Sequence, residues 1–210
     1  MGKRSADAEK AKRVLAQPDV PRLAHALEMR AAREIAASKD ARRAAVAVLL
    51  RPAGVSTALE MLMIRRARWE GDPWSGHIAL PGGRQEAGEA LVETVVRETR
   101  EETAIDLVSV GRILGRLDDL QARTVALPRI VITPFVAVMV GEATIVPSAE
   151  VAEAFWVPVA ALRDPAATRD TVIELPRGPL RVPSFQYEGN VIWGLTERIL
   201  RQFLGLVDEA

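Results

Sequence analysis

The sequence contains no cysteine, which excludes disulfide bonds and thiolate chemistry and fits a reducing compartment. It also lacks an excess of charge of either sign, because 28 lysine and arginine residues are balanced by 28 aspartate and glutamate residues. Proteins that coat nucleic acids usually carry a basic excess, so we expect no nucleic-acid partner. Histidine is scarce, and the two present, His25 and His77, have no histidine at ligand spacing. We expect His25 on the surface and His77 in a loop.

Long hydrophobic runs are missing as well. The longest, IVITPFVAVMV at residues 130–140, is too short to cross a bilayer and contains a proline. The N-terminus lacks the apolar segment of a secretion signal, so we expect a cytoplasmic protein that does not enter a membrane. Hydrophobic residues nevertheless make up 49% of the 210 residues, which is enough for the core of one domain.

The pattern of apolar residues predicts two parts, a helical extension at residues 1–40 and a domain at residues 41–210. In the extension, Pro21 is typical of a helix start, and Leu23, Leu27 and Ile35 fall near one helix face. In the domain, the pattern predicts strands at 43–50, 58–66, 78–83, 108–117 and 132–140, a strand leading into a helix at 153–162, and an amphipathic helix at 189–207. Hairpins with interspersed helices favour an α/β fold of the α+β kind, with a mixed sheet between helical layers.

One segment, GGRQEAGEALVETVVRETREETAI at residues 82–105, joins a glycine turn to an acidic helix predicted to begin near Gly88. Glu98 and Glu102 lie one turn apart on this helix, with Glu101 beside them, and like charges at that spacing destabilise a helix by about 0.2–0.5 kcal/mol per pair. A divalent cation between the carboxylates would remove the repulsion, and oxygen ligands suit Mg²⁺ or Mn²⁺. We expect one apolar arc to pack on the sheet, made of Leu91, Val92, Val95 and Val96.

The same helix can also be interpreted as an ordinary solvated face, because Glu93–Arg97 and Arg97–Glu101 are one-turn ion pairs. The upstream residues favour the metal site. Counted from Gly83, the acidic and basic residues match the pattern G-x5-E-x7-R-E-U-x-E-E-x-G-U, where U is bulky and apolar, and in this the segment resembles the Nudix box. The matching residues are Gly83, Glu89, Arg97, Glu98, Glu101, Glu102 and Ile105, whereas Thr99 replaces an apolar residue and Ala104 replaces the closing glycine.

The resemblance implies a Nudix-type α/β/α sandwich that hydrolyses diphosphate linkages with Mg²⁺ or Mn²⁺ as cofactor. It implies that Glu98, Glu101 and Glu102 are the catalytic and metal-binding acids. A backbone carbonyl near Gly82 or Gly83 is often a further metal ligand in the family.

The resemblance also implies that Glu89 and Arg97 hold the loop and the helix together through a salt bridge. Family members differ in the carboxylate that accepts the proton of the attacking water. Glu101 is one candidate. Glu150 and Glu153, before the segment FWVPV, are two others, although the sequence favours solvated loop acids at both positions.

The flanking segments resemble the coenzyme A diphosphatase branch of the family. In residues 61–83, the positions that align with this branch are Leu62, Arg65, Gly76, Pro81, Gly82 and Gly83, whereas Met63, Arg66 and Leu80 depart from it. The segment YEGNVIWGLTERIL at residues 187–200 resembles the entry to its C-terminal helix. This likeness implies cleavage of coenzyme A, or a related derivative, into adenosine 3′,5′-bisphosphate and phosphopantetheine.

Three arginines before the box, Arg65, Arg66 and Arg68, are candidate substrate-binding residues together with Gly83, because guanidinium groups pair with phosphate oxygens. A basic strand end that faces solvent would show the same pattern. Trp69 and Trp74 are placed to stack an adenine or to pack the turn.

Two other functions stay open. The chain could hydrolyse another nucleoside diphosphate derivative, such as a dinucleotide, a sugar nucleotide or an oxidised nucleotide, or it could be a non-catalytic domain that senses a nucleotide. Sensors tend to lose the acids of the box, and all are present here, which favours an enzyme. The resemblance allows a homodimer and leaves the role of residues 1–40 open.

Overall fold

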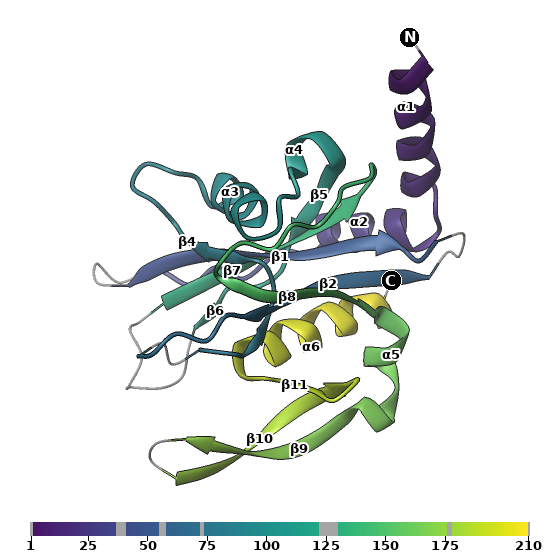
Figure 1. Ribbon diagram of the computed structural model, residues 1–210. Helices are drawn as coiled ribbons and strands as arrows, with labels where there is room; N and C mark the ends of the chain where they lie inside the picture. The colour runs from purple at the N-terminus through teal and green to yellow at the C-terminus, as the bar shows by residue number, and fades with distance from the viewer. Residues whose placement is uncertain are drawn as a thin grey trace.

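The computed structural model describes residues 2–36, 41–54, 58–71, 74–121, 130–175 and 178–209. Its centre is a mixed sheet in the order β3-β2-β1-β7-β5, in which β4 also pairs with β1, β6 with β7 and β8 with β2 (Figure 1). The strands of this sheet are β1 (Arg42–Pro52), β2 (Leu59–Arg66), β3 (Ile78–Ala79), β4 (Gly82–Arg84), β5 (Gly111–Arg116), β6 (Leu120–Gln121), β7 (Ile130–Met139) and β8 (Val151–Pro158). The strands β1 and β7 run parallel and the other pairs antiparallel, so the predicted mixed sheet is confirmed.

Helices cover both faces of the sheet. On one face lie α3 (Leu91–Thr103) and α4 (Leu107–Val110), and on the other lies α6 (Gly194–Glu209), as Figure 1 shows. The helix α2 (Asp19–Met29) packs into the same core as α6. Two shorter elements, α5 (Val159–Arg163) and a 3₁₀ turn (Pro165–Ala167), follow β8, while α1 (Gly2–Leu15) extends away from the body. The predicted α/β/α layering is therefore confirmed. No helix in the described ranges is long and apolar enough to cross a bilayer.

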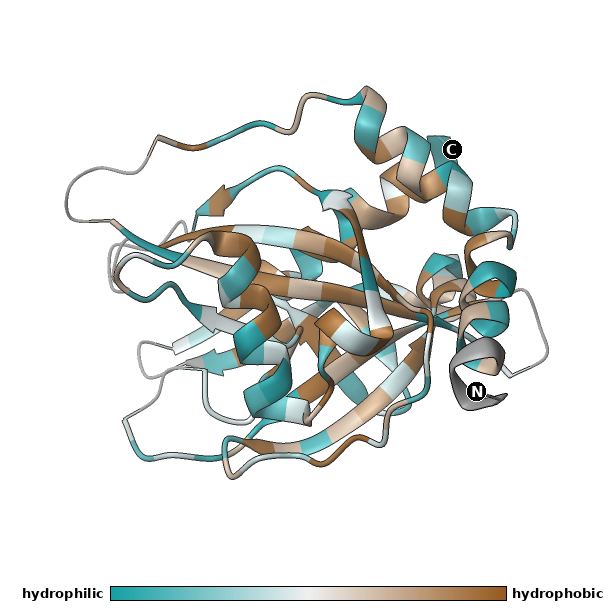
Figure 2. Ribbon diagram, turned by 90° about the horizontal axis from the view of Figure 1, so that it is seen from above, coloured by the Kyte–Doolittle hydropathy of each residue, from teal (hydrophilic) through white to brown (hydrophobic). Residues whose placement is uncertain are grey.

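Alternation along β1 divides the core into two layers. Ala47 and Leu49 face α3, and Val48 and Leu50 face α6, each with no exposed surface. Figure 2 shows hydrophobic colour predominating along the central strands, with paler residues between, and striped colour along the helices. Because both faces of β1 are buried, its sequence is almost entirely apolar instead of alternating.

The N-terminal helices join the main core on the α6 side. Val20, Leu23 and Leu27 of α2 are buried there, and Leu27 packs so closely on β5 that a methyl group at Gly115 would lie 2.8 Å from its Cβ. The predicted helical face is wrong at Ile35, because α2 ends at Met29 and residues 31–36 are not helical. The Ile35 backbone N–H instead donates to the buried carboxylate of Asp119 at 3.0 Å.

Two predicted boundaries are wrong for local reasons. Residues 107–110 form the short helix α4 instead of the start of a strand, because the Asp106 side chain accepts from the Val108 backbone N–H and caps the turn. Residues 190–193 form a strand, β11 (Asn190–Trp193), instead of the first turn of the C-terminal helix. The helix α6 begins after it, at Gly194.

A second sheet was not predicted. It has the order β11-β10-β9, with β9 at Thr168–Leu175 and β10 at Gly178–Tyr187, and it lies beyond α6 in Figure 1. Its sequence gives a weak strand signal because polar residues alternate on exposed faces and β10 contains Pro179 and Pro183. The β10–β11 turn is tight, and its central residues, Glu188 and Gly189, both have positive φ, as a type I′ hairpin requires.

The helix α3 ends in a left-handed residue that is not glycine. Ala104 has φ of 62°, and its N–H donates to the Arg100 carbonyl at 2.9 Å to close the last turn. Glycine is the usual residue in this conformation because a Cβ atom strains it. The departure of Ala104 from the glycine of the box is therefore a cost to the fold.

We predict that Ala104→Gly raises the free energy of unfolding by about 1 kcal/mol, because it removes this strain. Urea denaturation measures the change. The matched control is Ala160→Gly in the exposed part of α5, where glycine lowers helix stability by up to about 1 kcal/mol. A loss of stability in both variants would contradict the assignment of strain to residue 104.

Candidate functional site

The helix α3 turns two of its acids toward the sheet. It begins at Leu91 instead of near Gly88, and the Glu93 side chain accepts from the Ala90 N–H at 2.8 Å, which satisfies one free donor at the helix start. The predicted apolar arc is wrong at Val92, which is 41% exposed. The buried face is made of Thr94, Val95, Thr99, Glu102 and Thr103. A carboxylate therefore lies on the face of the helix that packs against the sheet.

Glu102 is the most buried acid of the predicted set, with 4% of its surface exposed. Its Oε2 accepts from the Gly82 backbone N–H at 2.8 Å, which ties the helix to the glycine turn. Burial raises the pKa of Glu102 to about 7, against the opposing effect of that hydrogen bond, and the charge of Glu98 raises it further. Burial likewise raises the pKa of Glu98, and the hydrogen bond from Arg97 opposes it. This pair of acids is costly to keep ionised without a nearby cation.

The two glycines leave room for this arrangement. A methyl group on Gly83 would lie 2.3 Å from the Glu98 carboxyl carbon, so a side chain there would displace the carboxylate. Gly82 has φ of 150°, and a methyl group on it would lie 2.3 Å from the Ala45 carbonyl oxygen in β1. Gly83 thus makes space for the acid, whereas Gly82 makes space for the neighbouring strand.

Arg97 connects four groups around the same turn. Its Nε donates to Glu89 at 2.9 Å, and its Nη1 donates to Glu98 at 2.9 Å and to Glu101 at 3.0 Å. Its Nη2 donates to the Arg84 carbonyl and to Glu89. The structure thus contains the Glu89–Arg97 salt bridge that the resemblance implied and the one-turn Arg97–Glu101 pair that the sequence indicated. It adds contacts of Arg97 with Glu98 and with the Arg84 carbonyl, which sequence reasoning missed.

Glu89 is held ionised by the same network. The hydrogen bond from Arg97 lowers the pKa of Glu89 to about 2, with further donation from the Glu86 backbone and from Thr94. In the other direction, Glu89 and then Glu98 raise the pKa of Arg97. Glu89 precedes the helix instead of occupying its first turn, and its role in this structure is to fix the loop before α3.

The segment before β8 brings one further acid near the cluster. Ser148 N–H donates to the Glu102 carbonyl at 3.0 Å, and Ala67 N–H donates to the Glu150 carbonyl at 2.8 Å. This segment therefore lies between the end of α3 and the end of β2. After larger effects of burial, the charge of Glu150 raises the pKa values of both Glu98 and Glu102. Glu150 is exposed, so its carboxylate is accessible to solvent at the rim of the pair.

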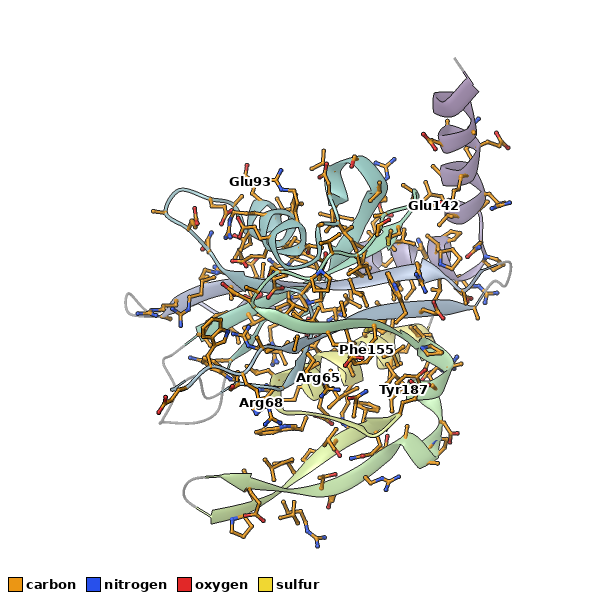
Figure 3. All side chains as sticks on the ribbon, viewed as in Figure 1. Arg65, Arg68, Glu93, Glu142, Phe155 and Tyr187 are labelled. Carbon is orange, nitrogen blue, oxygen red and sulfur yellow. The ribbon has the colours of Figure 1, made fainter. Side chains whose placement is uncertain are left out.

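The three candidate arginines do not all lie on the same side of the sheet as the acids. The charge of Arg66 acts on Glu102 and lowers its pKa, so Arg66 is the arginine beside the acids. Arg65 faces the second sheet, where its Nη2 donates to Asn190 at 2.5 Å and its Nε to Glu153 at 3.2 Å. Figure 3 shows Arg65 and Arg68 on that side, with Glu93 of α3 on the opposite side. Alternation along a strand explains the separation of neighbouring side chains.

The loop between β2 and β3 carries the aromatic candidates. Trp69 is 58% exposed, and its backbone N–H donates to the Ser75 hydroxyl at 2.8 Å. The His77 ring lies 4.7 Å from the Trp193 ring and not in the acidic cluster, and His25 is exposed as expected. Trp69 is therefore the aromatic side chain of this loop with the most surface open to a ligand.

The acids fit a divalent cation by their chemistry and burial. In the parts of the chain that are described, no three acidic or histidine side chains converge into a ready-made metal cage, since Arg97 bridges Glu98 and Glu101. The charge of Glu98 raises the pKa of the buried Glu102, and Gly83 leaves space beside the Glu98 carboxylate. A set of oxygen donors whose negative charges repel one another suits Mg²⁺ or Mn²⁺.

Comparisons with known proteins give the family and the fold. The sequence model of the NUDIX domain matches residues 40–174. An uncharacterised Nudix hydrolase, NudL, from Yersinia enterocolitica is 34% identical over 133 residues, which cover 61% of this chain and 64% of that protein. An uncharacterised protein of Schizosaccharomyces pombe is 34% identical over 107 residues, or 49% of this chain and 32% of that protein. The chain therefore spans less than two thirds of the length of either relative.

Two solved structures are similar in fold. A MutT/nudix family protein from Enterococcus faecalis superposes with a TM-score of 0.54 at 18% identity, covering 96% of this chain and 74% of that one. The Ap4A hydrolase of C. elegans superposes with a TM-score of 0.53 at 17% identity, covering 80% of this chain and 99% of that one. At these identities the likeness shows the fold alone.

We predict that the two glycine substitutions separate the site from the fold. Gly83→Ala displaces the flexible Glu98 side chain, so Mn²⁺ binding weakens while the melting temperature changes little. Gly82→Ala meets the β1 backbone and strains its φ, so it lowers stability by about 2 kcal/mol or more. Calorimetric titration with Mn²⁺ and thermal melting measure the two effects.

The control is Gly205→Ala in α6, where an added methyl group meets open space. It is expected to leave Mn²⁺ affinity at the wild-type value and to raise the melting temperature slightly, because alanine is more favourable than glycine inside a helix. Wild-type Mn²⁺ affinity in Gly83→Ala would show that the position of Glu98 does not matter to the cation.

Proposed function

Because the chain belongs to the Nudix family, we propose that it is a metal-dependent diphosphohydrolase that cleaves the diphosphate bond of coenzyme A or a related derivative. The observation that carries the proposal is the placement of Glu98 and Glu102 against the Gly82–Gly83 turn, with the charges of Arg66 and Glu150 acting on them. Family membership supports the linkage chemistry, and the likeness of residues 61–83 to the coenzyme A branch supports the substrate.

The acids of α3 would hold the cation. We assign Glu98, Glu101 and Glu102 as its ligands, with a carbonyl near Gly82 as a further candidate. Bound Mg²⁺ or Mn²⁺ supplies charge neutralisation at the diphosphate and acidifies water. Arg97 donates hydrogen bonds to the carboxylates of Glu98 and Glu101 and holds them close to the helix surface. These acids concentrate negative charge at one point, which would repel a phosphate substrate in the absence of the cation.

Arg66 is the side chain suited to bind the substrate diphosphate. It lies on the same side of β2 as the acids, and a guanidinium group can pair with two phosphate oxygens. Its positive charge also favours the ionised form of Glu102 and so opposes part of the larger effect of burial, which raises the pKa of Glu102. Arg68 and Trp69 follow in the exposed loop, where they could contact the more distant parts of a nucleotide.

Glu150 is our assignment for the base that takes the proton from the attacking water. Of the three sequence candidates, Glu101 is engaged by Arg97 and Glu153 is engaged by Arg65 toward the second sheet. Glu150 is exposed and close enough for its charge to act on both buried acids. The water oxygen then bonds to one phosphorus of the diphosphate, and the bond from that phosphorus to the bridging oxygen breaks. The other phosphate leaves with the bridging oxygen.

An activity screen tests the proposal. The chain is incubated with Mg²⁺ or Mn²⁺ and a panel of coenzyme A, acyl derivatives, NADH, ADP-ribose, sugar nucleotides and oxidised nucleotides, and products are identified by mass spectrometry. We expect adenosine 3′,5′-bisphosphate and phosphopantetheine from coenzyme A. Turnover of NADH or ADP-ribose with coenzyme A untouched would reject the substrate, and nucleotide binding without any turnover would indicate a sensor.

We predict that Glu150→Gln lowers kcat about 100-fold or more, because a general base contributes about 10²–10⁴-fold. Mn²⁺ affinity should change little in this variant, whereas Glu102→Gln should lose both activity and Mn²⁺ affinity. The matched control is Glu142→Gln, in the same segment before β8, whose carboxylate pairs with Lys10. An unchanged kcat in Glu150→Gln would return the role of base to Glu101.

A further inference from the structure

The end of β2 contains an irregularity that separates Arg65 from Arg66. In the pairing with β8, Arg65 lies opposite Glu153 but Arg66 lies opposite Val151, so Ala152 is an extra residue in β8. Such a bulge interrupts the hydrogen-bond ladder and changes the direction of the side chains beside it. The direction of Arg66 toward the acids therefore depends on how firmly the backbone at residues 65 and 66 is held.

Two kinds of contact hold this backbone. On the strand side, Arg66 N–H donates to the His77 carbonyl at 3.0 Å, and Ala67 N–H donates to the Glu150 carbonyl. On the opposite face, the Arg65 side chain reaches Asn190 at 2.5 Å and the exposed Glu153 at 3.2 Å. The contact with Glu153 is a surface pair that contributes little. The partly buried hydrogen bond to Asn190 is the stronger of the two restraints on Arg65.

Asn190 itself stands on a rigid support. It is the first residue after the tight Glu188–Gly189 turn and pairs directly with Tyr187 across the β10–β11 hairpin. Further along β11, Ile192 has no exposed surface and the Trp193 ring contacts His77. Figure 3 shows Arg65 and Tyr187 between the central sheet and the second sheet. The second sheet thus presents a fixed acceptor to the bulge.

We propose that Asn190 is a positioning residue, which holds Arg65 and so aims Arg66, across the bulge, at the acid pair and the substrate diphosphate. The inference rests on the proposed function in that it takes Arg66 as the diphosphate-binding side chain. It gives the second sheet a role in the reaction without contact to the reacting atoms. The sequence contained no sign of it, because Asn190 lies 124 positions after Arg66.

Four variants test the proposal by steady-state kinetics and by calorimetric titration with ADP as a diphosphate probe. Asn190→Ala is expected to lower kcat/KM about tenfold, mainly through KM, and to weaken ADP binding by a similar factor. Asn190→Asp keeps an oxygen acceptor for Arg65 and should restore both values to within about twofold of wild type. In the Arg66→Ala background, Asn190→Ala should cause less than about a twofold further loss.

The matched control is Gln186→Ala in the same hairpin, since its amide donates to Thr171 and Ser184 within the second sheet. It should change neither KM nor ADP affinity, whatever its effect on melting temperature. Wild-type behaviour of Asn190→Ala, or an equal loss with and without Arg66, would overturn the proposal. If the wild-type chain bound ADP but hydrolysed nothing, the hydrolase proposal would fail, and the same ADP titrations would still decide the role of Asn190.

Discussion

The placement of one buried and one partly buried carboxylate beside a glycine turn is the constraint on which the site depends. Glu98 and Glu102 lie on the face of α3 that packs toward the sheet, where desolvation disfavours their ionised forms. Nothing in the packing of an ordinary helix requires this, because an apolar residue would serve the core better. The surrounding residues reduce the cost. The Gly82 backbone N–H donates to Glu102, and Gly83 leaves space for the Glu98 carboxylate. Arg97, the residue before Glu98 on the helix, supplies a positive charge.

The central sheet separates the chemistry from its support. On the α3 side, alternation along β2 places Arg66 near the acids, and the segment before β8 adds Glu150. On the α6 side, the second sheet, α2 and α6 share one apolar core, which ends near Arg65 and Asn190. The N-terminal helices contribute Leu23 and Leu27 to that core, so residues 19–29 are part of the packing and not only an addition to it. The site is therefore supported from a face that carries none of its acids.

Sequence reasoning found the parts that depend on spacing. The distances from Gly83 to Glu89 and Arg97 fix their identity along the chain, and β1, β2 and β7 were evident from their apolar runs. It failed where long-range contacts decide the outcome. The exposed strands β9 and β10, the second of which contains two prolines, gave no clear period. No pattern could show the extra residue in β8 or the contact of Arg65 with Asn190. The register of α3 was also missed, because Val92 appears apolar in sequence but lies outside the packed face.

The two departures from the box show that its packing can vary while its charges stay in place. Thr99 is fully buried, and its hydroxyl has no hydrogen-bond partner among the described residues, a defect worth about 1–3 kcal/mol. Ala104 adds the strain of a left-handed alanine at the helix end. Among the described residues, neither side chain hydrogen-bonds to a carboxylate, and the hydrogen bond from Gly82 to Glu102 is kept. Stability and carboxylate geometry are thus separate demands on α3. The helix tolerates a loss of stability at Thr99 and Ala104 because the contacts that hold the carboxylates come from Gly82 and Arg97.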